Sequence, residues 1–108
     1  MESDRLGPGP QWEETIKQKL NRETAQIGWD ELARLFATGV VIVVKDGLDL
    51  VEIAESFVKD DSQRISGLME DQQIWKANDR DAVKWNDMNA VVWAVVVSPW
   101  VLVQGDKP

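Results

Sequence analysis

The chain has 108 residues, of which 44% are hydrophobic and 29% charged, and this balance is typical of a single soluble globular domain. Its formal net charge of -7 opposes binding to nucleic acid or to an anionic membrane surface, because such partners require a basic face. The sequence has neither cysteine nor histidine, which excludes disulfides, thiolate chemistry, a Ser-His-Asp triad and the commonest zinc ligand.

The amino-terminal residues 1–11 are polar and contain two Gly-Pro pairs, which do not fit inside a helix or strand, so we expect a flexible tail there. This segment has no apolar stretch of signal-peptide length, and no apolar run in the chain approaches the ~20 residues that span a bilayer. We therefore predict a cytoplasmic protein with one domain over residues 12–104 and a frayed tail over residues 105–108.

Two helices are predicted in the first third of the chain. The first covers residues 12–27, where apolar side chains recur at helical spacing: Trp12, Ile16, Leu20 and Ile27. The second begins after Asp30 as its N-cap and ends at Gly39.

Runs of β-branched residues predict the strands. Val40–Val44 is an uninterrupted aliphatic run closed by turn residues, as in a strand buried on both faces, and Ala90–Val97 is a second such run. Gln73–Lys76 fits a short edge strand. Ser98-Pro99 does not suit a two-residue hairpin turn, which requires positive φ, so we expect a kink there and an edge position for Trp100–Gln104.

Polar residues before apolar stripes predict further helices. Asp49 with Glu52 three residues later forms a capping-box pattern ahead of a helix that ends near Lys59. A shorter helix follows Asp60–Ser62, and Asn78 caps another that runs to Asn86. Together the elements predict an α+β fold: a small mixed or antiparallel sheet of three to four strands, with helices packed over one face.

The order of these pieces resembles a known family. Leu48–Glu52 opens the middle helix, Trp85-Asn86 precedes the last strands, and Pro99–Gln104 closes the chain. Over roughly residues 12–104 the sequence is similar to the small bacterial proteins of the domain-of-unknown-function 2288 family, although its Gly-Pro-rich start and many tryptophans depart from that pattern. The resemblance implies a compact, single-domain intracellular protein and supplies no catalytic residue.

One group of acidic residues has a spacing that metal sites use. Asp79-Arg80-Asp81 has the spacing of two carboxylate ligands for Mg²⁺ or Ca²⁺, but the glycine and distal glutamate of an EF-hand loop are missing. Both aspartates are equally explained as first-turn acids of a helix. We predict no metal site, no other cofactor and no catalytic residue.

Six tryptophans with no tyrosine are the unusual feature of the composition. They supply either core volume or an aromatic pocket. Trp75 and Trp85 lie at the ends of predicted elements beside polar residues, and with Asn86 they are the candidates for a pocket. Trp100 shares this position and is the candidate anchor of an interface.

Two functions follow from these features. The first is a non-enzymatic interaction or structural module that forms a homodimer, because the predicted edge strand is apolar and unprotected by charge. Its interface candidates are Trp100, Val101, Leu102 and Val103. The alternative is a small ligand-binding protein or divalent-metal enzyme built on carboxylates and tryptophans. A flat apolar patch would favour the first function, and a pocket with converging polar groups the second.

Overall fold

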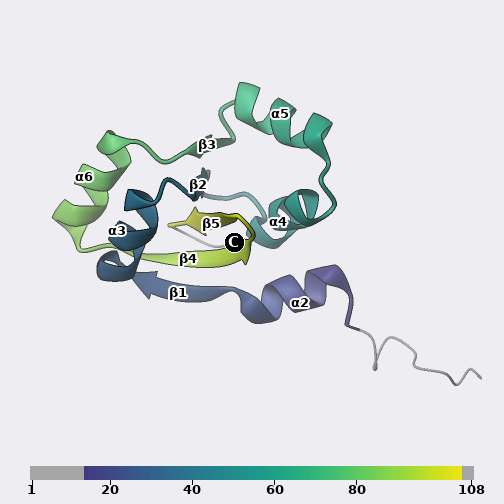
Figure 1. Ribbon diagram of the computed structural model, residues 1–108, viewed down its shortest axis with the longest axis horizontal. Helices are drawn as coiled ribbons and strands as arrows, with labels where there is room; N and C mark the ends of the chain where they lie inside the picture. Colours follow the sequence, from purple (N-terminus) through teal and green to yellow (C-terminus); the bar gives the residue numbers. More distant parts are fainter. Residues whose placement is uncertain (1–13, 106–108) are drawn as a thin grey trace, which may run out of the picture.

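The computed structural model describes residues 14–105, which form one mixed β-sheet flanked by helices (Figure 1). The predicted tail over residues 1–11, Trp12 and residues 106–108 lie outside the described part. The strands are β1 (Ala25–Gly28), β2 (Val41–Val44), β3 (Ile74–Lys76), β4 (Val91–Val97) and β5 (Trp100–Gln104). The helices are α2 (Ile16–Glu23), α3 (Trp29–Ala37), α4 (Leu50–Val58), α5 (Ser62–Glu70) and α6 (Asp79–Met88).

The sheet has five strands in the order β1-β4-β5-β2-β3, one more than the largest number predicted. β1 pairs with β4, β4 with β5 and β2 with β3 in antiparallel fashion, whereas β2 and β5 are parallel. The prediction that Trp100–Gln104 lies at an edge is therefore wrong. β5 is the central strand. It pairs with β4 on one side and with β2, which is distant in the sequence, on the other.

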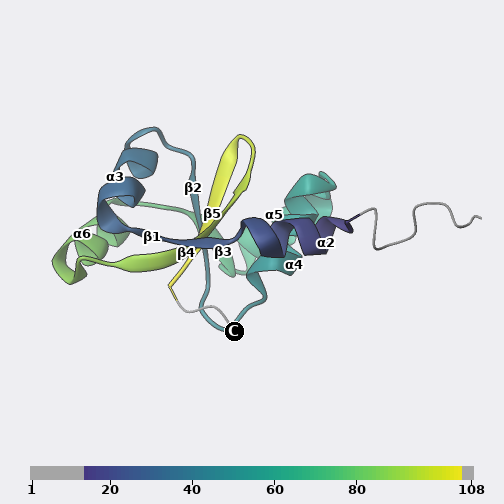
Figure 2. The same ribbon diagram turned by 90° about the horizontal axis from the view of Figure 1, so that it is seen from below.

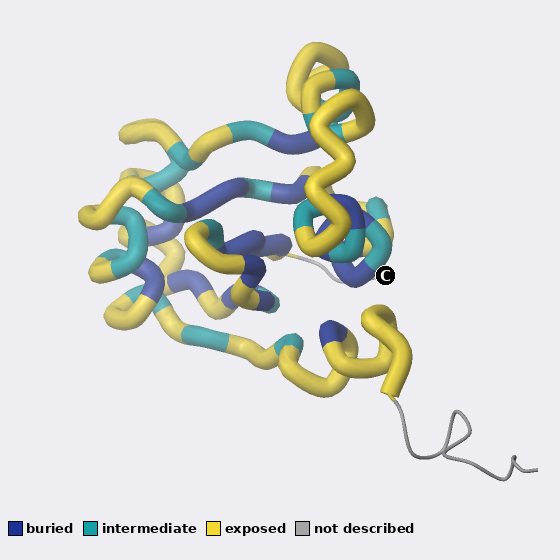
Figure 3. Tube along the Cα trace, turned by 45° about the vertical axis from the view of Figure 1, so that its right-hand side comes forward, coloured by how far each residue is buried: buried dark blue, intermediate teal, exposed yellow. Residues whose placement is uncertain are grey.

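Helices cover both faces of the sheet, so the prediction of helices over one face is also wrong. Along β2, Ile42 and Val44 pack into a core beneath α2, α4 and α5, whereas Val41 and Val43 face a second core beneath α3 and α6. Figure 2 shows the strands between these two groups of helices. The buried residues follow the strands while the outer helix surfaces are exposed (Figure 3). Continuous aliphatic strands require this arrangement, because both of their faces must be removed from water.

The first predicted helix is divided into two elements. α2 ends at Glu23, and the residues from Ala25 to Gly28 form the edge strand β1. Leu20 belongs to one core and Ile27 packs against the other, on the opposite face of the sheet. A separation of seven residues would place both side chains on one face of a continuous helix. Because the helix ends and a strand begins between them, the two side chains lie on opposite faces of the sheet.

Side-chain caps begin three of the helices where the sequence indicated them. The Asp49 carboxylate accepts a hydrogen bond from the Glu52 backbone N–H at 3.2 Å, and Asp61 caps α5 in the same way. Glu52 does not complete a capping box, because its carboxylate faces Arg64 at 3.4 Å. Asp30 is not an N-cap: α3 begins at Trp29 after Gly28, and Asp30 lies in the first turn.

Ser98 and Pro99 connect β4 to β5 directly, which corrects the expectation that they could not form a hairpin turn. Val97 and Trp100 are opposite each other in the ladder, and the Ser98–Pro99 peptide is cis. The expectation considered only the common two-residue turns, whereas the register of the ladder leaves two residues between the strands.

Candidate functional site

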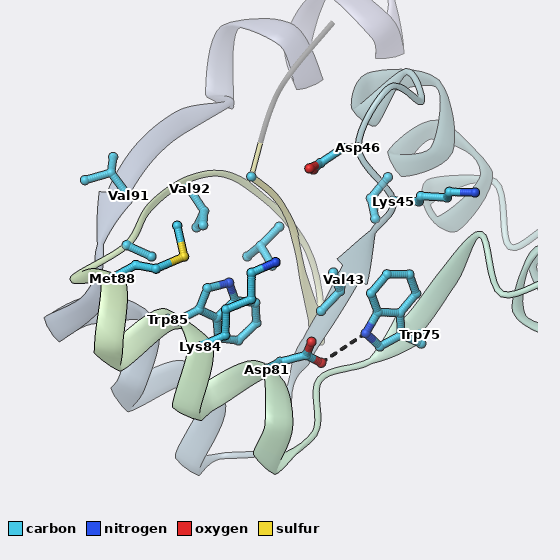
Figure 4. Close-up of a pocket in the computed structure, with 14 residues that line it drawn as sticks. Val43, Lys45, Asp46, Trp75, Asp81, Lys84, Trp85, Met88, Val91 and Val92 are labelled. Atoms are coloured by element: carbon cyan, nitrogen blue, oxygen red, sulfur yellow. Dashed lines mark hydrogen bonds between the residues drawn. The ribbon is translucent and has the colours of Figure 1, made fainter.

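A groove of about 470 Å³ lies on the face of the sheet that carries α3 and α6. It opens at the carboxyl ends of the parallel strands β2 and β5, where residues 43–46 and Val103 with Gly105 contribute to its lining (Figure 4). In sheets with parallel strands, this end is where ligands commonly bind, because the chain departs there into loops that leave a crevice. The volume is within the range of small-molecule sites.

Helix α6 forms one wall of the groove. Its start is fixed by a capping box in which the Asn78 side chain accepts from the Asp81 N–H and Asp81 accepts from the Asn78 N–H. It ends at Asn89, which adopts the left-handed conformation with φ of 47°. Helical spacing then brings four side chains to the groove: Asp81, Lys84, Trp85 and Met88.

Trp75, from the edge strand β3, forms part of the opposite wall. Its indole Nε1 donates to Asp81 Oδ2 over 3.0 Å, across the gap between β3 and α6 (Figure 4). The same oxygen accepts the backbone N–H of Asn78 at 3.1 Å. Asp81 therefore holds the tryptophan in place and caps the helix at once, and both hydrogen bonds are accepted by Oδ2.

Trp85 lies deeper, with 8% of its surface exposed. Its ring packs at a tilt against Trp29 of α3, with centroids 6.4 Å apart. Its indole nitrogen is directed to the groove side (Figure 4), and within residues 14–105 it has no hydrogen-bond acceptor, unlike the indole of Trp75. A buried tryptophan usually donates this N–H to a partner.

Two lysines, Lys45 and Lys84, line the groove. Neither forms an ion pair among the described residues, whose salt bridges use Lys17, Arg22, Lys59 and Arg64. Lys84 extends along the groove beside Trp85, whereas the side chain of Lys45 is directed away from it (Figure 4). Lys84 is therefore the cation that a bound molecule would meet.

The far end of the groove is narrow because two chain segments meet there. A Cβ atom placed on Gly105 would lie 3.4 Å from Asp46 Oδ1, in ordinary van der Waals contact, so the two segments lie close together here. Asp46 itself is engaged in an interaction and is not a free carboxylate.

The structure brings together two of the three predicted pocket residues. Trp75 and Trp85 face the same groove from different elements, whereas Asn86 is exposed and does not line it. Asn86 follows Trp85 on α6, and a step of one residue turns a side chain about 100° around a helix. Lys84 and Met88 were not predicted, although Lys84 lies three residues after Asp81 and Met88 three residues after Trp85, which is the helical spacing that places side chains on one face.

The predicted interface residues are not available on the surface as a group. Val101, Leu102 and Val103 are buried in the central strand, and each is covered by the helices of one face. Trp100 is half-buried on the face opposite the groove, and the Lys76 ammonium lies 5.8 Å from its ring centroid. These four residues cannot form the interface that was predicted, because both neighbouring strands are already paired with β5.

Over residues 14–105, no cluster of three or more acidic, histidine or cysteine side chains is arranged to hold a metal ion. The Asp79-Arg80-Asp81 sequence separates its two carboxylates on α6, and the second one binds Trp75. No helix in the described range has the length and apolar character of a membrane span.

Comparison with known proteins gives a family and a related structure. The family model described as "Protein of unknown function (DUF2288)" matches residues 15–105. The solution structure of PA1075 from Pseudomonas aeruginosa is similar, with a TM-score of 0.75 and 35% sequence identity over 89% of each chain. No curated protein matches the sequence.

Proposed function

The chain belongs to the family described as Protein of unknown function (DUF2288), and from the groove we propose that it is a non-enzymatic module that binds a small ligand between α6 and the sheet. The observation that supports this proposal is the combination of an open groove of about 470 Å³ with two tryptophans that face it from separate elements. Ligand sites are typically concave, mostly apolar and furnished with a few polar groups.

The lining of the groove favours binding over catalysis. It includes no serine, threonine, glutamate or amide side chain, and its nucleophile candidates are limited to two lysines. Asp81 is engaged by two hydrogen bonds, so it lacks the geometry of a general base facing a substrate. Among the described residues no ion pair joins either lysine to a carboxylate that could activate it as an amine nucleophile.

The proposal is tested by titrating ¹⁵N-labelled protein with a set of small apolar fragments and following the indole N–H resonances of the tryptophans. A ligand in the groove should shift the resonances of Trp75 and Trp85 more than that of Trp100, which lies on the other face of the sheet. Fragments that shift all three alike, or none of them, would count against a site in the groove.

A matched pair of variants on α6 sharpens this test. Met88 and Val83 are both apolar and both exposed, by 63% and 60%, but only Met88 lines the groove. Met88→Ala should weaken binding because it removes part of the apolar wall, whereas Val83→Ala should leave the dissociation constant unchanged. Equal effects of the two variants would contradict the proposed site.

Self-association is a second candidate, supported by the edge strand β1. Its four residues, Ala25–Gly28, pair with β4 on one side, and no other described strand pairs with the opposite side. The segment has no charge and no proline, which are the common means of protecting a sheet edge. Two copies could join their β1 strands about a twofold axis.

Light scattering tests this candidate. A dimer should appear as the protein concentration rises, and Gln26→Lys at the outer edge should weaken it, because two lysines would meet across the twofold axis. Gln63→Lys on α5 makes the same change of charge away from β1 and serves as the control. A mass near the 12.2 kDa of one chain at every concentration would exclude the dimer.

A further inference from the structure

The groove contains two hydrogen-bond donors with no acceptor among the described residues. One is the indole Nε1–H of Trp85, on a side chain that is 8% exposed, and the other is the ammonium of Lys84, the preceding residue. Both face the same side of the groove in Figure 4. A donor at the surface of a nearly buried side chain is suited to an incoming acceptor, because binding then satisfies a polar group that the fold leaves unpaired.

The acidic groups at the groove are engaged elsewhere. Asp81 Oδ2 accepts from both Trp75 and Asn78, and Asp46 also has an interaction partner. A ligand that brought its own ammonium or amide donor would find Asp81 Oδ2 already shared by two N–H groups. A ligand that brought an acceptor would meet two unengaged donors, one of them positively charged.

The rest of the groove is apolar. Strands β2, β4 and β5 contribute Val43, Val92 and Val103 to the lining. Met88 and Val91 stand at the rim with more than half of each side chain exposed. These side chains suit a hydrocarbon or aromatic body, whose burial removes both its own surface and theirs from water.

We propose that the ligand is a small monocarboxylate with an apolar body, held with its carboxylate between the Lys84 ammonium and the Trp85 indole N–H. This inference rests on the proposed binding function and specifies the chemical class that the groove selects. The apolar body lies on the valines of the sheet, with Met88 at its side. Trp75, held by Asp81, closes the other wall.

The position of the donors favours a carboxylate over a phosphate. Lys84 and Trp85 are in the second half of α6, near the carbonyl end of the helix dipole, which opposes two negative charges more strongly than one. Phosphate sites commonly use backbone N–H groups at a helix start, and the start of α6 is occupied by its own capping box. A single lysine with one neutral donor suits a single negative charge.

The test uses 3-phenylpropionate as the probe and 3-phenylpropanamide as its neutral counterpart of the same shape. Binding is followed by the indole N–H resonances of ¹⁵N-labelled protein, with Trp85→Phe used to assign the Trp85 signal. The acid should shift that signal to saturation, and the amide should bind roughly tenfold more weakly or worse, because it lacks the charge-assisted contact with Lys84.

Two variants of α6 separate the proposed contact from a general charge effect. Lys84→Met should remove the preference for the acid over the amide while retaining binding of the apolar body. Arg80→Met removes a cation from the same helix that does not line this groove, and it should leave the preference unchanged. Both positions are exposed, so neither change disturbs the core.

The outcomes distinguish the two proposals. If acid and amide bind equally at the Trp75 and Trp85 signals, or if Lys84→Met keeps the preference, the carboxylate assignment is wrong while the groove remains a binding site. If the acid shifts the Trp85 signal no more than that of Trp100 at millimolar concentration, the assignment is also wrong. If in addition no apolar fragment perturbs the groove, the proposed function fails with it.

Discussion

The Trp75 indole and the Asp81 carboxylate, 3.0 Å apart, connect the edge strand β3 to the first turn of α6. Asp81 also accepts the Asn78 N–H that begins the helix, so one oxygen serves the wall of the groove and the helix cap together. The shape of the groove therefore depends on the stability of the helix start.

Replacing this carboxylate should affect both features. Asp81→Ala should lower the free energy of unfolding by about 1–3 kcal/mol, because it removes one half of the capping box and leaves the indole without its acceptor. Urea denaturation measures the loss. Asp79→Ala is the control. Asp79 is an exposed acid in the same turn, and its side chain accepts no hydrogen bond from the described residues. Equal losses for both variants would mean that neither the Asn78 contact nor the Trp75 contact of Asp81 contributes to stability.

The two aspartates predicted as N-caps provide a second comparison. Asp49→Ala should cost about 0.5–2 kcal/mol, because the Glu52 N–H loses its acceptor at the start of α4. Asp30→Ala should lower the free energy of unfolding by only a few tenths of a kcal/mol, because Asp30 contributes a first-turn charge but no cap hydrogen bond. Denaturant midpoints of the two variants would show this difference, and an unchanged midpoint for Asp49→Ala would contradict the cap.

These caps illustrate what the sequence could predict. A cap is a local interaction over three residues, so Asp49 before an apolar stripe and Asn78 before Asp81 were both recognisable from their neighbours. The aliphatic runs of β2 and β4 were equally local signals. Family membership, inferred from the same short patterns, is confirmed by the match over residues 15–105.

The errors concern long-range pairing. Nothing near Trp100 in the sequence indicates that β5 lies parallel to β2, whose paired residues are sixty positions earlier, and this pairing makes the predicted edge strand the central one. The groove depends on the same pairing, because its floor combines Val43 with Val103. Trp75 and Trp85 could be singled out by type and position, but their convergence on one groove could not.

The ion pair between Glu14 and Arg22 gives a prediction for pH. The hydrogen bonds from the Arg22 guanidinium, at 2.8 Å, hold the pKa of Glu14 below its ordinary value. A carboxyl whose pKa is lowered by folding contributes stability above its unfolded pKa and loses that contribution as the pH falls through the folded pKa. Arg22→Gln should therefore raise the pKa of Glu14 in a carboxyl ¹³C titration.

Lys19→Gln is the control for this titration, because Lys19 acts on Glu14 only through its charge and more weakly than Arg22. It should raise the pKa by less than Arg22→Gln does. A Glu14 titration that is the same in wild type and Arg22→Gln would show that the hydrogen-bonded pair does not persist in solution. Both groups are exposed, so the effect on stability should be small.

Divalent ions should not stabilise the protein specifically. In the described residues no three acidic side chains are grouped so as to hold an ion, and Asp81 is engaged by Trp75. A site that binds only the folded protein would add ~2.7 kcal/mol at a hundredfold excess of ion over its dissociation constant. Thermal unfolding with millimolar Mg²⁺ or Ca²⁺ checks this expectation. A saturable rise in Tm with one ion, absent with NaCl of equal ionic strength, would contradict it.

The last prediction concerns Gln104, a fully buried polar side chain at the end of β5. Its Nε2 donates to the backbone carbonyls of Lys45, at 2.9 Å, and Leu48, at 2.7 Å, and so ties the loop after β2 to the central strand. Its Oε1 has no hydrogen-bond partner among the described residues. The stabilising role of the Gln104 amide therefore rests on its two donor contacts.

Removing those donors should therefore be costly. Gln104→Leu should lower the free energy of unfolding by about 1–3 kcal/mol, because the Leu48 carbonyl loses its side-chain donor and the Lys45 carbonyl keeps only the backbone N–H of Leu48, at 3.3 Å. Gln104→Glu should be worse, and its loss should grow as the pH rises above the ordinary carboxyl pKa, since a buried carboxylate offers no donor and faces two carbonyl oxygens. Gln26→Leu, on the exposed edge strand, makes the same chemical change without burial and should be nearly neutral. Urea denaturation at several pH values compares the three variants, and a Gln104→Leu protein as stable as wild type would show that solvent satisfies the loop carbonyls in its place.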